Sequence, residues 1–253
     1  MVFKKILELL FPSNIYCISC GGIIDRSRIY SLCDNCARMF HWANGRTCEK
    51  CGRALQDDYI HNICADCREN EHFFEKGYTC AQYGINERKL LLSFKYGGKL
   101  YIGEKIAEAM ADRLGGENLD ADLIIPVPMY RKKQRKRGYN QAEIISEYLS
   151  KKMAVPYSGK LLLRTGDTAA MSRLAAAERR MNMEGAFSMA PGSEEKVKGK
   201  SILLVDDIYT TGSTADACAQ ALMASGARKV QVITFAAGAN LIGWDNAAAQ
   251  VCG

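Results

Sequence analysis

Four Cys-x-x-Cys pairs restrict what the first part of this chain can fold into more than any other feature. They lie between residues 17 and 67 of 253 and recur at similar intervals, so this segment reads as an internal duplication. Each pair on a tight turn points two thiolates at one ion, and two turns complete a tetrahedron with Zn–S contacts of about 2.3 Å. The candidate zinc ligands are Cys17, Cys20, Cys33, Cys36, Cys48, Cys51, Cys64 and Cys67.

Two glycines stand where a metal-binding turn needs a backbone of positive φ. Gly21 follows the first pair and Gly52 follows the third, and glycine adopts positive φ without steric cost. Disulfides are an alternative that a reducing cytoplasm disfavours, and buried free thiols do not explain the spacing. We expect one or two structural zinc sites, because four thiolates leave no open position for a catalytic water.

The sequence leaves open which pairs share an ion. Consecutive pairing joins the first two pairs on one zinc and the last two on another, whereas interleaved pairing alternates them. The intervals fit zinc ribbons and favour the consecutive arrangement. Three histidines near this segment, His41, His61 and His72, are weaker ligand candidates, for which exposed or packing roles are the simpler expectation.

Beyond residue 78 the sequence alternates between helical and strand patterns. Helical periodicity is found in residues 86–98, 103–116, 140–153 and 214–226, and apolar strand-like runs in residues 121–128, 158–164, 186–190, 200–207 and 229–237. Alternation of this kind predicts an α/β fold in which a mostly parallel sheet is flanked by helices.

Residues 202–214 read ILLVDDIYTTGST and concentrate polar groups at one predicted strand end. The apolar run predicts a buried strand that ends at Asp206 and Asp207, and ligands of such sheets bind beyond the carboxyl ends of the strands. Adjacent carboxylates repel each other, and they can accept hydrogen bonds from vicinal hydroxyls or orient a magnesium ion through its waters. Two solvated aspartates are the plain alternative.

The residues after this acidic pair suit a phosphate group. Thr210, Thr211, Gly212, Ser213 and Thr214 offer successive backbone N–H groups, hydroxyls and the N-terminus of a predicted helix. The glycine allows close approach of the backbone to an anion. Carboxylates for sugar hydroxyls beside a phosphate-binding loop predict a sugar-phosphate site, with simple helix capping as the alternative.

The string VDDIYTTGST resembles the phosphoribosyl pyrophosphate (PRPP) motif of type I phosphoribosyltransferases. The resemblance implies that Asp206 and Asp207 form the catalytic pair and hold the ribose 2′ and 3′ hydroxyls, with Mg²⁺ accompanying PRPP. It also implies that the following residues bind PRPP, with the 5′-phosphate on the loop: Ile208, Tyr209, Thr210, Thr211, Gly212, Ser213 and Thr214. Catalysis in such an enzyme is largely positioning and electrostatics.

Displacement of pyrophosphate from PRPP requires a second anion site. The segment PVPMYRKKQRKRGYNQ leaves another predicted strand at its carboxyl end and leads into a helix, so it is the natural candidate. We expect Arg137, Gly138 and Tyr139 near the pyrophosphate. For the basic residues 131–136, a solvated loop or contact with single-stranded DNA are alternatives.

From residue 3 to residue 238 the chain is similar to the ComF family of proteins, which are associated with DNA uptake in competent bacteria. The resemblance rests on FKYGG, PVPMYRKKQRKRGYNQAE, RTGDTAAMSRLAAAERRMNMEGAF and the four Cys-x-x-Cys pairs. It implies a double zinc ribbon in residues 1–77 and a type I phosphoribosyltransferase-like domain in residues 78–240. Apolar residues at helical spacing in VFKKILELLFPS predict that the first of these domains begins with a short helix. Residues 241–253 stay unassigned.

The family resemblance also suggests that residues 164–184 form a mobile loop over the substrate, with a plain helical insert as the alternative. Met171 stands where the family commonly has glutamine, which weakens the transfer of a role to this loop. Lys95 and Tyr96 of FKYGG are candidates to approach the site, with core packing of Phe94 and Tyr96 as the alternative. The acceptor is held in this fold class by a variable hood, here residues 78–105, and no base-recognition pattern is readable there.

Two functions from different classes remain. One is an enzyme that transfers a phosphoribosyl group to an unidentified acceptor. The other is a non-enzymatic protein that senses PRPP, or that binds single-stranded DNA or DNA-uptake proteins through the ribbon and residues 131–137. The net charge of +6 is a weak hint of an anionic partner. No stretch has the ~20 apolar residues of a membrane helix and no export signal is recognisable, so we expect a cytoplasmic protein.

Overall fold

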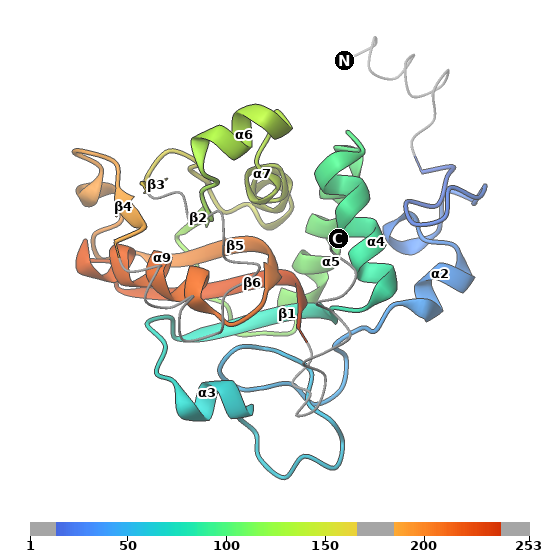
Figure 1. Ribbon diagram of the computed structural model, residues 1–253, viewed down its shortest axis with the longest axis horizontal. Coiled ribbons are helices and arrows are strands. Elements are labelled where there is room, and N and C mark those ends of the chain that lie inside the picture. The colour runs from blue at the N-terminus through green and yellow to red at the C-terminus, as the bar shows by residue number, and fades with distance from the viewer. Residues whose placement is uncertain (1–13, 166–184, 239–253) are drawn as a thin grey trace.

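Residues 14–165 and 185–238 are described by a computed structural model of the protein (Figure 1). Residues 166–184 of the expected mobile loop, including Met171, lie outside the described residues, as do the expected N-terminal helix before residue 14 and the tail at 241–253. Within the described part, no helix is both long and apolar enough to cross a membrane.

A four-stranded sheet forms the centre of the molecule, in the order β1-β6-β5-β2. Its strands are β1 (Lys76–Gln82), β2 (Leu123–Pro126), β5 (Ser201–Tyr209) and β6 (Lys229–Ala237). All three pairings are parallel. β2, β5 and β6 contain continuous apolar runs because both faces of the sheet are covered, and the expected parallel α/β architecture is confirmed.

Helices pack on both faces of the sheet. Alternate residues of β5 point in opposite directions, and Leu203 and Val205 join an apolar cluster with α4 (Ile85–Tyr96), α5 (Tyr101–Leu114) and α7 (Gln141–Met153). On the other face, Ile202 and Leu204 join a second cluster with α9 (Ser213–Ala224). Each expected helical segment of residues 78–226 therefore contains a helix, and two apolar clusters hold the layers together.

Three features of this domain differ from the sequence-based expectation. β1 was not predicted, because the segment KGYTCAQ mixes small and polar residues and shows no clear period. The basic run expected as a solvated loop forms the short exposed helix α6 (Arg131–Arg137), since lysine and arginine favour helix. The expected strands near residues 162 and 188 do form, but β3 (Leu162–Arg164) and β4 (Phe187–Met189) pair antiparallel in a separate two-stranded sheet.

The cysteine-rich segment consists of two copies of one structure. We call residues 16–41 the first ribbon and residues 47–72 the second ribbon; each position of the second follows its counterpart by 31 residues, as Cys48 follows Cys17. In each ribbon a short antiparallel bridge flanks the first cysteine pair, and a short helix begins at the second pair. These helices are α2 (Asp34–Met39) and α3 (Ala65–Glu69), while η1 (Ile29–Ser31) is a 3-10 turn of the first ribbon. The expected internal duplication is confirmed.

The two ribbons pack against different parts of the α/β domain (Figure 1). Buried cysteines of the first ribbon extend the apolar cluster on the α5 and α7 face, and those of the second ribbon extend the cluster on the α9 face. β1 begins at Lys76, close to the division predicted at residue 77. That division stays a prediction.

Candidate functional site

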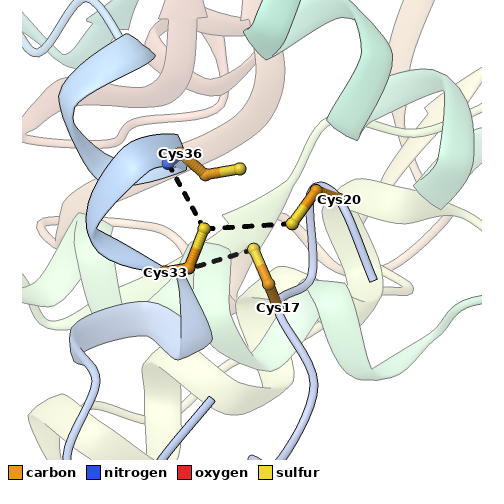
Figure 2. A group of neighbouring side chains, drawn as sticks. All are labelled: Cys17, Cys20, Cys33 and Cys36. Atoms are coloured by element: carbon orange, nitrogen blue, oxygen red, sulfur yellow. Dashed lines mark hydrogen bonds between the residues drawn. The ribbon is translucent and has the colours of Figure 1, made fainter. Parts of the chain in front are cut away.

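Each ribbon gathers its four thiols into one site. The Sγ atoms of Cys17, Cys20, Cys33 and Cys36 lie within 4.8 Å of one another, and so do those of Cys48, Cys51, Cys64 and Cys67. Figure 2 shows the first group, with its side chains converging on one point. The Sγ atoms of Cys20 and Cys33 are 3.8 Å apart, as are those of Cys51 and Cys64, which is about the edge of a tetrahedron with Zn–S contacts of 2.3 Å. The cysteines are grouped consecutively, and two four-cysteine sites fit structural zinc.

Backbone geometry supports these sites in both ribbons. The amide of Cys33 donates to the Sγ of Cys17 at 3.4 Å, and the amide of Cys64 donates to the Sγ of Cys48 at 3.2 Å. Gly21 and Gly52 have φ of 79° and 75°, as the metal-binding turns require. Hydrogen bonds to sulfur stabilise the thiolate form that binds a metal. In the described part of the chain, the groups able to hold a metal include no histidine.

The acidic pair lies near the carboxyl end of β5, in the centre of the sheet. The strand does not end at Asp207, as predicted, but continues to Tyr209, because β6 offers pairing partners as far as Ala237. Asp207 is buried and Asp206 is partly buried. The turn into α9 therefore starts at Thr210, two residues later than expected.

A lysine from α4 partly neutralises the negative charge of this acidic pair. Lys95 Nζ lies 2.5 Å from Asp207 Oδ2, and the amide of Asp207 donates to Asp206 Oδ1 at 2.8 Å. Burial, followed by the charge of Asp207, raises the pKa of Asp206 to about 8. Burial alone would lower the pKa of Lys95, but the attraction of Asp207, its hydrogen bond and Asp206 outweigh burial and raise it. Lys95 therefore lies beside the acidic pair, the position expected for it.

The loop after β5 has the shape expected of an anion-binding turn. Gly212 has φ of 81° and precedes the first residue of α9, Ser213. The hydroxyls of Thr211 and Ser213 lie 2.8 Å apart, and Thr210 is exposed. A helix N-terminus with free amides and nearby hydroxyls attracts an anion.

A basic groove of about 460 Å³ opens on the other side of Lys95. Its lining residues are Lys95, Tyr96, Gly98, Lys133, Lys136, Arg137 and Tyr139. The guanidinium of Arg137 lies over the ring of Tyr96, 5.0 Å from its centre, and the hydroxyl of Tyr139 donates to the carbonyl of Phe94. Lys95 is thus shared between the groove and the acidic pair. Gly138 has φ of 90° and ends α6 beside the groove.

The structure brings together residues that sequence reasoning considered separately. The acidic pair and the loop follow one another on β5 and α9, and Lys95 joins them to the groove that contains Arg137 and Tyr139. The individual roles of these residues toward PRPP stay predictions.

Sequence reasoning missed two residues that contact the loop from the second ribbon. Arg53 donates to the carbonyl of Thr210, and His72, considered only as a ligand or a packing residue, pairs with Asp216 of α9. One signal was available for Arg53. The repeat places a glycine, Gly22, at the matching position of the first ribbon, so the arginine is a departure from the duplication.

Comparisons with known families match both parts of the chain. Residues 6–68 match the double zinc ribbon domain, and residues 102–251 match the phosphoribosyl transferase domain. The second match extends over more than half of the chain and includes β5, the loop and α9. The fold is therefore of the phosphoribosyltransferase type with an N-terminal double zinc ribbon.

Several curated proteins are similar over most of their length. Competence protein F of Haemophilus influenzae is 31% identical over 224 residues, which cover 87% of this chain and 95% of that protein. DNA utilization protein YhgH of Escherichia coli O157:H7 is 29% identical, covering 80% and 88%, and competence protein ComFC of Bacillus subtilis is 25% identical, covering 77% and 79%. With its two four-cysteine ribbons and its phosphoribosyltransferase-type domain, the chain belongs to the ComF family of competence protein F, ComFC and YhgH.

Proposed function

We propose that this protein binds PRPP with Mg²⁺ at the carboxyl end of β5 and transfers its phosphoribosyl group to an acceptor. The observation that carries the proposal is the position of the Asp206–Asp207 pair between two anion-binding features. The loop before α9 follows the pair directly, and the basic groove is reached through Lys95. This order matches that of the groups in PRPP, with the 5′-phosphate, the ribose diol and the pyrophosphate in sequence.

The loop would hold the 5′-phosphate, and the acidic pair would accept hydrogen bonds from the ribose hydroxyls. Amides at the start of α9 and the hydroxyls of Thr211 and Ser213 supply donors without adding a positive side chain. Carboxylates accept two hydroxyl donors readily. Lys95 would serve as the counter-ion of Asp207 until the ligand arrives, since its ammonium already lies in the groove.

The groove would stabilise the leaving group. A nucleophile on the acceptor forms a bond to C1 of the ribose while the bond from C1 to the pyrophosphate oxygen breaks, and both bonding electrons leave with pyrophosphate. Lys133, Lys136 and Arg137 would offset the negative charge that develops there. Asp206 and Asp207 would stabilise the positive charge on the ribose. Mg²⁺ would be bound together with the pyrophosphate oxygens, as is usual for this hard cation.

A role in DNA uptake or utilisation is part of the proposal. It is supported by the names of the relatives, which include competence proteins and DNA utilization proteins. The acceptor would then be a compound or macromolecule of that process, and a cytoplasmic location would fit this role.

A second candidate is a protein that senses PRPP or binds single-stranded DNA without turnover. The observation that favours it is the composition of the groove, where cationic side chains alternate with Tyr96 and Tyr139, and the Tyr96 side chain is largely exposed. Lysines that follow a backbone and aromatic rings that stack on bases are the usual elements of a single-strand site. The structure of the groove suits either a pyrophosphate or a nucleic-acid phosphate.

Calorimetric titration with Mg²⁺ and PRPP tests the binding claim. We compare the unaltered protein with the double variant Asp206→Asn/Asp207→Asn, and use Asp57→Asn/Asp58→Asn as a matched control, because that adjacent pair is exposed in the second ribbon. Loss of two charged hydrogen-bond acceptors predicts a fall in affinity of roughly 100-fold or more in the first variant. The control should bind like the unaltered protein. Absent binding, or equal binding by both double variants, would overturn the proposal.

Pyrophosphate release and salt dependence separate the two candidates. Release of pyrophosphate from PRPP with a supplied acceptor supports transfer, whereas binding without release for nucleobases, amines and single-stranded DNA favours sensing. Replacing Lys132, Lys133, Arg135 and Lys136 by glutamine should reduce the salt dependence of single-stranded DNA binding by several ion equivalents if α6 contacts phosphates. An unchanged slope would argue against DNA at this helix.

A further inference from the structure

We propose that Arg53 of the second ribbon is a positioning residue that sets the conformation of the 5′-phosphate loop. The inference rests on the proposed function, because it assigns a task to the same loop. It concerns how a zinc ribbon can act on a ligand site to which it contributes no direct contact. Three observations support it: the contacts of Arg53, the docking of His72, and the difference between the two ribbons.

Arg53 links the second ribbon to the loop through a buried guanidinium. Only 3% of the residue is exposed. Its Nη2 donates to the carbonyl oxygen of Thr210 at 2.7 Å, and its Nη1 pairs with Asp66 Oδ2 at 2.7 Å. The guanidinium also lies over the ring of Tyr209, 5.8 Å from its centre. Asp66 belongs to α3, between the metal-site cysteines Cys64 and Cys67, so the ribbon orients the arginine through this helix.

The hydrogen bond to Thr210 determines which way the next amide points. In a trans peptide the C=O and N–H groups point in opposite directions, and the structure has no cis peptide among its described residues. Because the carbonyl of Thr210 is held toward the ribbon, the amide of Thr211 points away from it. In the proposed site, the 5′-phosphate would bind on that side, at the start of α9. Arg53 therefore presents a donor to the ligand without touching the ligand.

A second contact joins the second ribbon to the helix that follows the loop. Nδ1 of His72 lies 2.6 Å from Asp216 Oδ2 in the first turn of α9, and the amide of Phe73 donates to the other carboxylate oxygen at 3.2 Å. A Cβ added to Gly212 would lie 2.3 Å from the hydroxyl of Tyr209 and 3.2 Å from His72. The loop is thus packed tightly at Gly212, and little space remains for it to move toward the second ribbon.

The first ribbon provides an internal comparison. At the positions that match Arg53 and Asp66 it has Gly22 and Asn35, so it has no equivalent ion pair. Metal binding alone therefore does not require the arginine. Burying a guanidinium is costly unless each polar group is satisfied, and Nε of Arg53 has no hydrogen-bond partner among the described residues. A residue that only attached the ribbon could be apolar, which favours a positioning role for the carbonyl contact.

Fragments of PRPP distinguish positioning from general support. We measure binding of ribose 5-phosphate, which reports on the loop, and of Mg²⁺ with pyrophosphate, which reports on the groove. Arg53→Met should weaken ribose 5-phosphate binding about tenfold or more and leave pyrophosphate binding within about twofold, with two zinc ions retained per chain. Arg53→Lys should recover part of the loss. Arg46→Met is the matched control, because Arg46 directly precedes the second ribbon and its guanidinium donates to carbonyls of that ribbon, those of Asp57 and Tyr59.

The possible results distinguish failure of the positioning role of Arg53 from failure of the proposed function. If Arg53→Met retains its zinc and binds ribose 5-phosphate normally, or loses both fragments equally, the inference is overturned. If Arg53→Met does not fold, Asp66→Asn replaces it, since the Asp66 side chain is 45% exposed and tolerates the change; we expect about threefold weaker ribose 5-phosphate binding, and unchanged binding contradicts the inference. If the unaltered protein binds neither fragment nor PRPP, the proposed function itself fails and the inference with it.

Discussion

The two ribbons share one metal-binding framework but contact the α/β domain differently. In both, a histidine at the same place in the repeat pairs with a carboxylate in the first turn of a helix: His41 with Glu87 of α4, and His72 with Asp216 of α9. The His41 side chain is 59% exposed, however, whereas that of His72 is 1% exposed. Only the second ribbon adds a buried arginine to the contact.

The repeated and the non-repeated positions of the ribbons therefore serve separate purposes. The repeated cysteines and glycines fix the metal site, and the positions that diverge decide what each ribbon supports. The first ribbon supports α4, which carries Lys95 toward the acidic pair. The second ribbon supports the loop and α9. Together they hold the two sides of the proposed PRPP site.

Removing one zinc ligand from either ribbon, in two separate variants, should give the largest difference between the two ribbons. Cys51→Ser and Cys20→Ser should each reduce the zinc content from two ions to one, and structural zinc contributes about 10 kcal/mol or more to the folding of isolated zinc fingers. Both variants should therefore be less stable. We expect Cys51→Ser to lose PRPP affinity by more than about 100-fold and Cys20→Ser by a smaller factor, about tenfold, because the first ribbon reaches the proposed site only through α4. Zinc analysis and calorimetry at a temperature where both variants stay folded check this, and equal losses of affinity would contradict it.

Alanine at the two matching turn glycines tests how closely each ribbon approaches the sheet. Both have positive φ, so each substitution costs about 1 kcal/mol through the backbone. A Cβ at Gly52 would also lie 2.5 Å from the carbonyl oxygen of Gly77 in β1, whereas one at Gly21 would meet nothing within 4 Å. Gly52→Ala should lower the free energy of unfolding by about 3 kcal/mol in total and Gly21→Ala by about 1 kcal/mol. Denaturant unfolding measures both; similar values would mean that the second ribbon can move away from β1.

The two histidines provide a matched test of docking. His72→Ala should cost about 2 kcal/mol of unfolding free energy. The substitution removes a buried ring that stacks on Phe74, and it leaves Oδ2 of Asp216 without the imidazole that it contacts. His41→Ala should cost about 0.5 kcal/mol, because the ring is exposed and the His41 amide still donates to Glu87. Thermal unfolding of the two variants checks the order, and a larger loss for His41→Ala would reverse the comparison.

The acidic pair between the two supported elements predicts a pH dependence of stability. The pKa of Asp206 is raised from 3.8 to about 8, mainly by burial, so this side chain holds a proton in the folded chain but not in the unfolded chain between these values. The contribution of Asp206 to the free energy of unfolding should therefore fall as the pH rises from about 4 to 8 and then level off. Asp206→Asn should remove this dependence and raise stability at pH 8 by about 1 kcal/mol, since the side chain is partly exposed. If the free energy of unfolding of the variant depends on pH as that of the unaltered protein does, another group causes the dependence.

The metal sites and the central sheet could be predicted because their signals are local. Two thiolates per turn and a repeating interval are sufficient to predict a site of four cysteines, and continuous apolar runs between helical segments predict a parallel sheet. The position of the acidic pair followed from the end of one such run. The exact end of β5 did not, because strand length depends on the partner β6.

The contacts of the loop could not be predicted, since they join residues far apart in the sequence. Arg53 and Thr210 are separated by 157 positions, and no local pattern indicates that a ribbon arginine reaches a carbonyl of the loop. β1 was not predicted for a related reason, because its burial also depends on segments far away in the sequence. Its burial comes from the ribbon on one side and β6 on the other, not from an apolar period of its own.

Hydrogen exchange at the backbone amides of residues 210–214 tests whether PRPP binds at the loop that Arg53 positions. The measurement compares the unaltered protein with and without saturating Mg²⁺ and PRPP, and repeats both conditions for Arg53→Met. We expect strong protection of the Thr211 to Ser213 amides by the ligand, no change in the first ribbon, and faster exchange of the free loop in the variant. Exchange in the loop that is the same with and without PRPP would contradict this expectation.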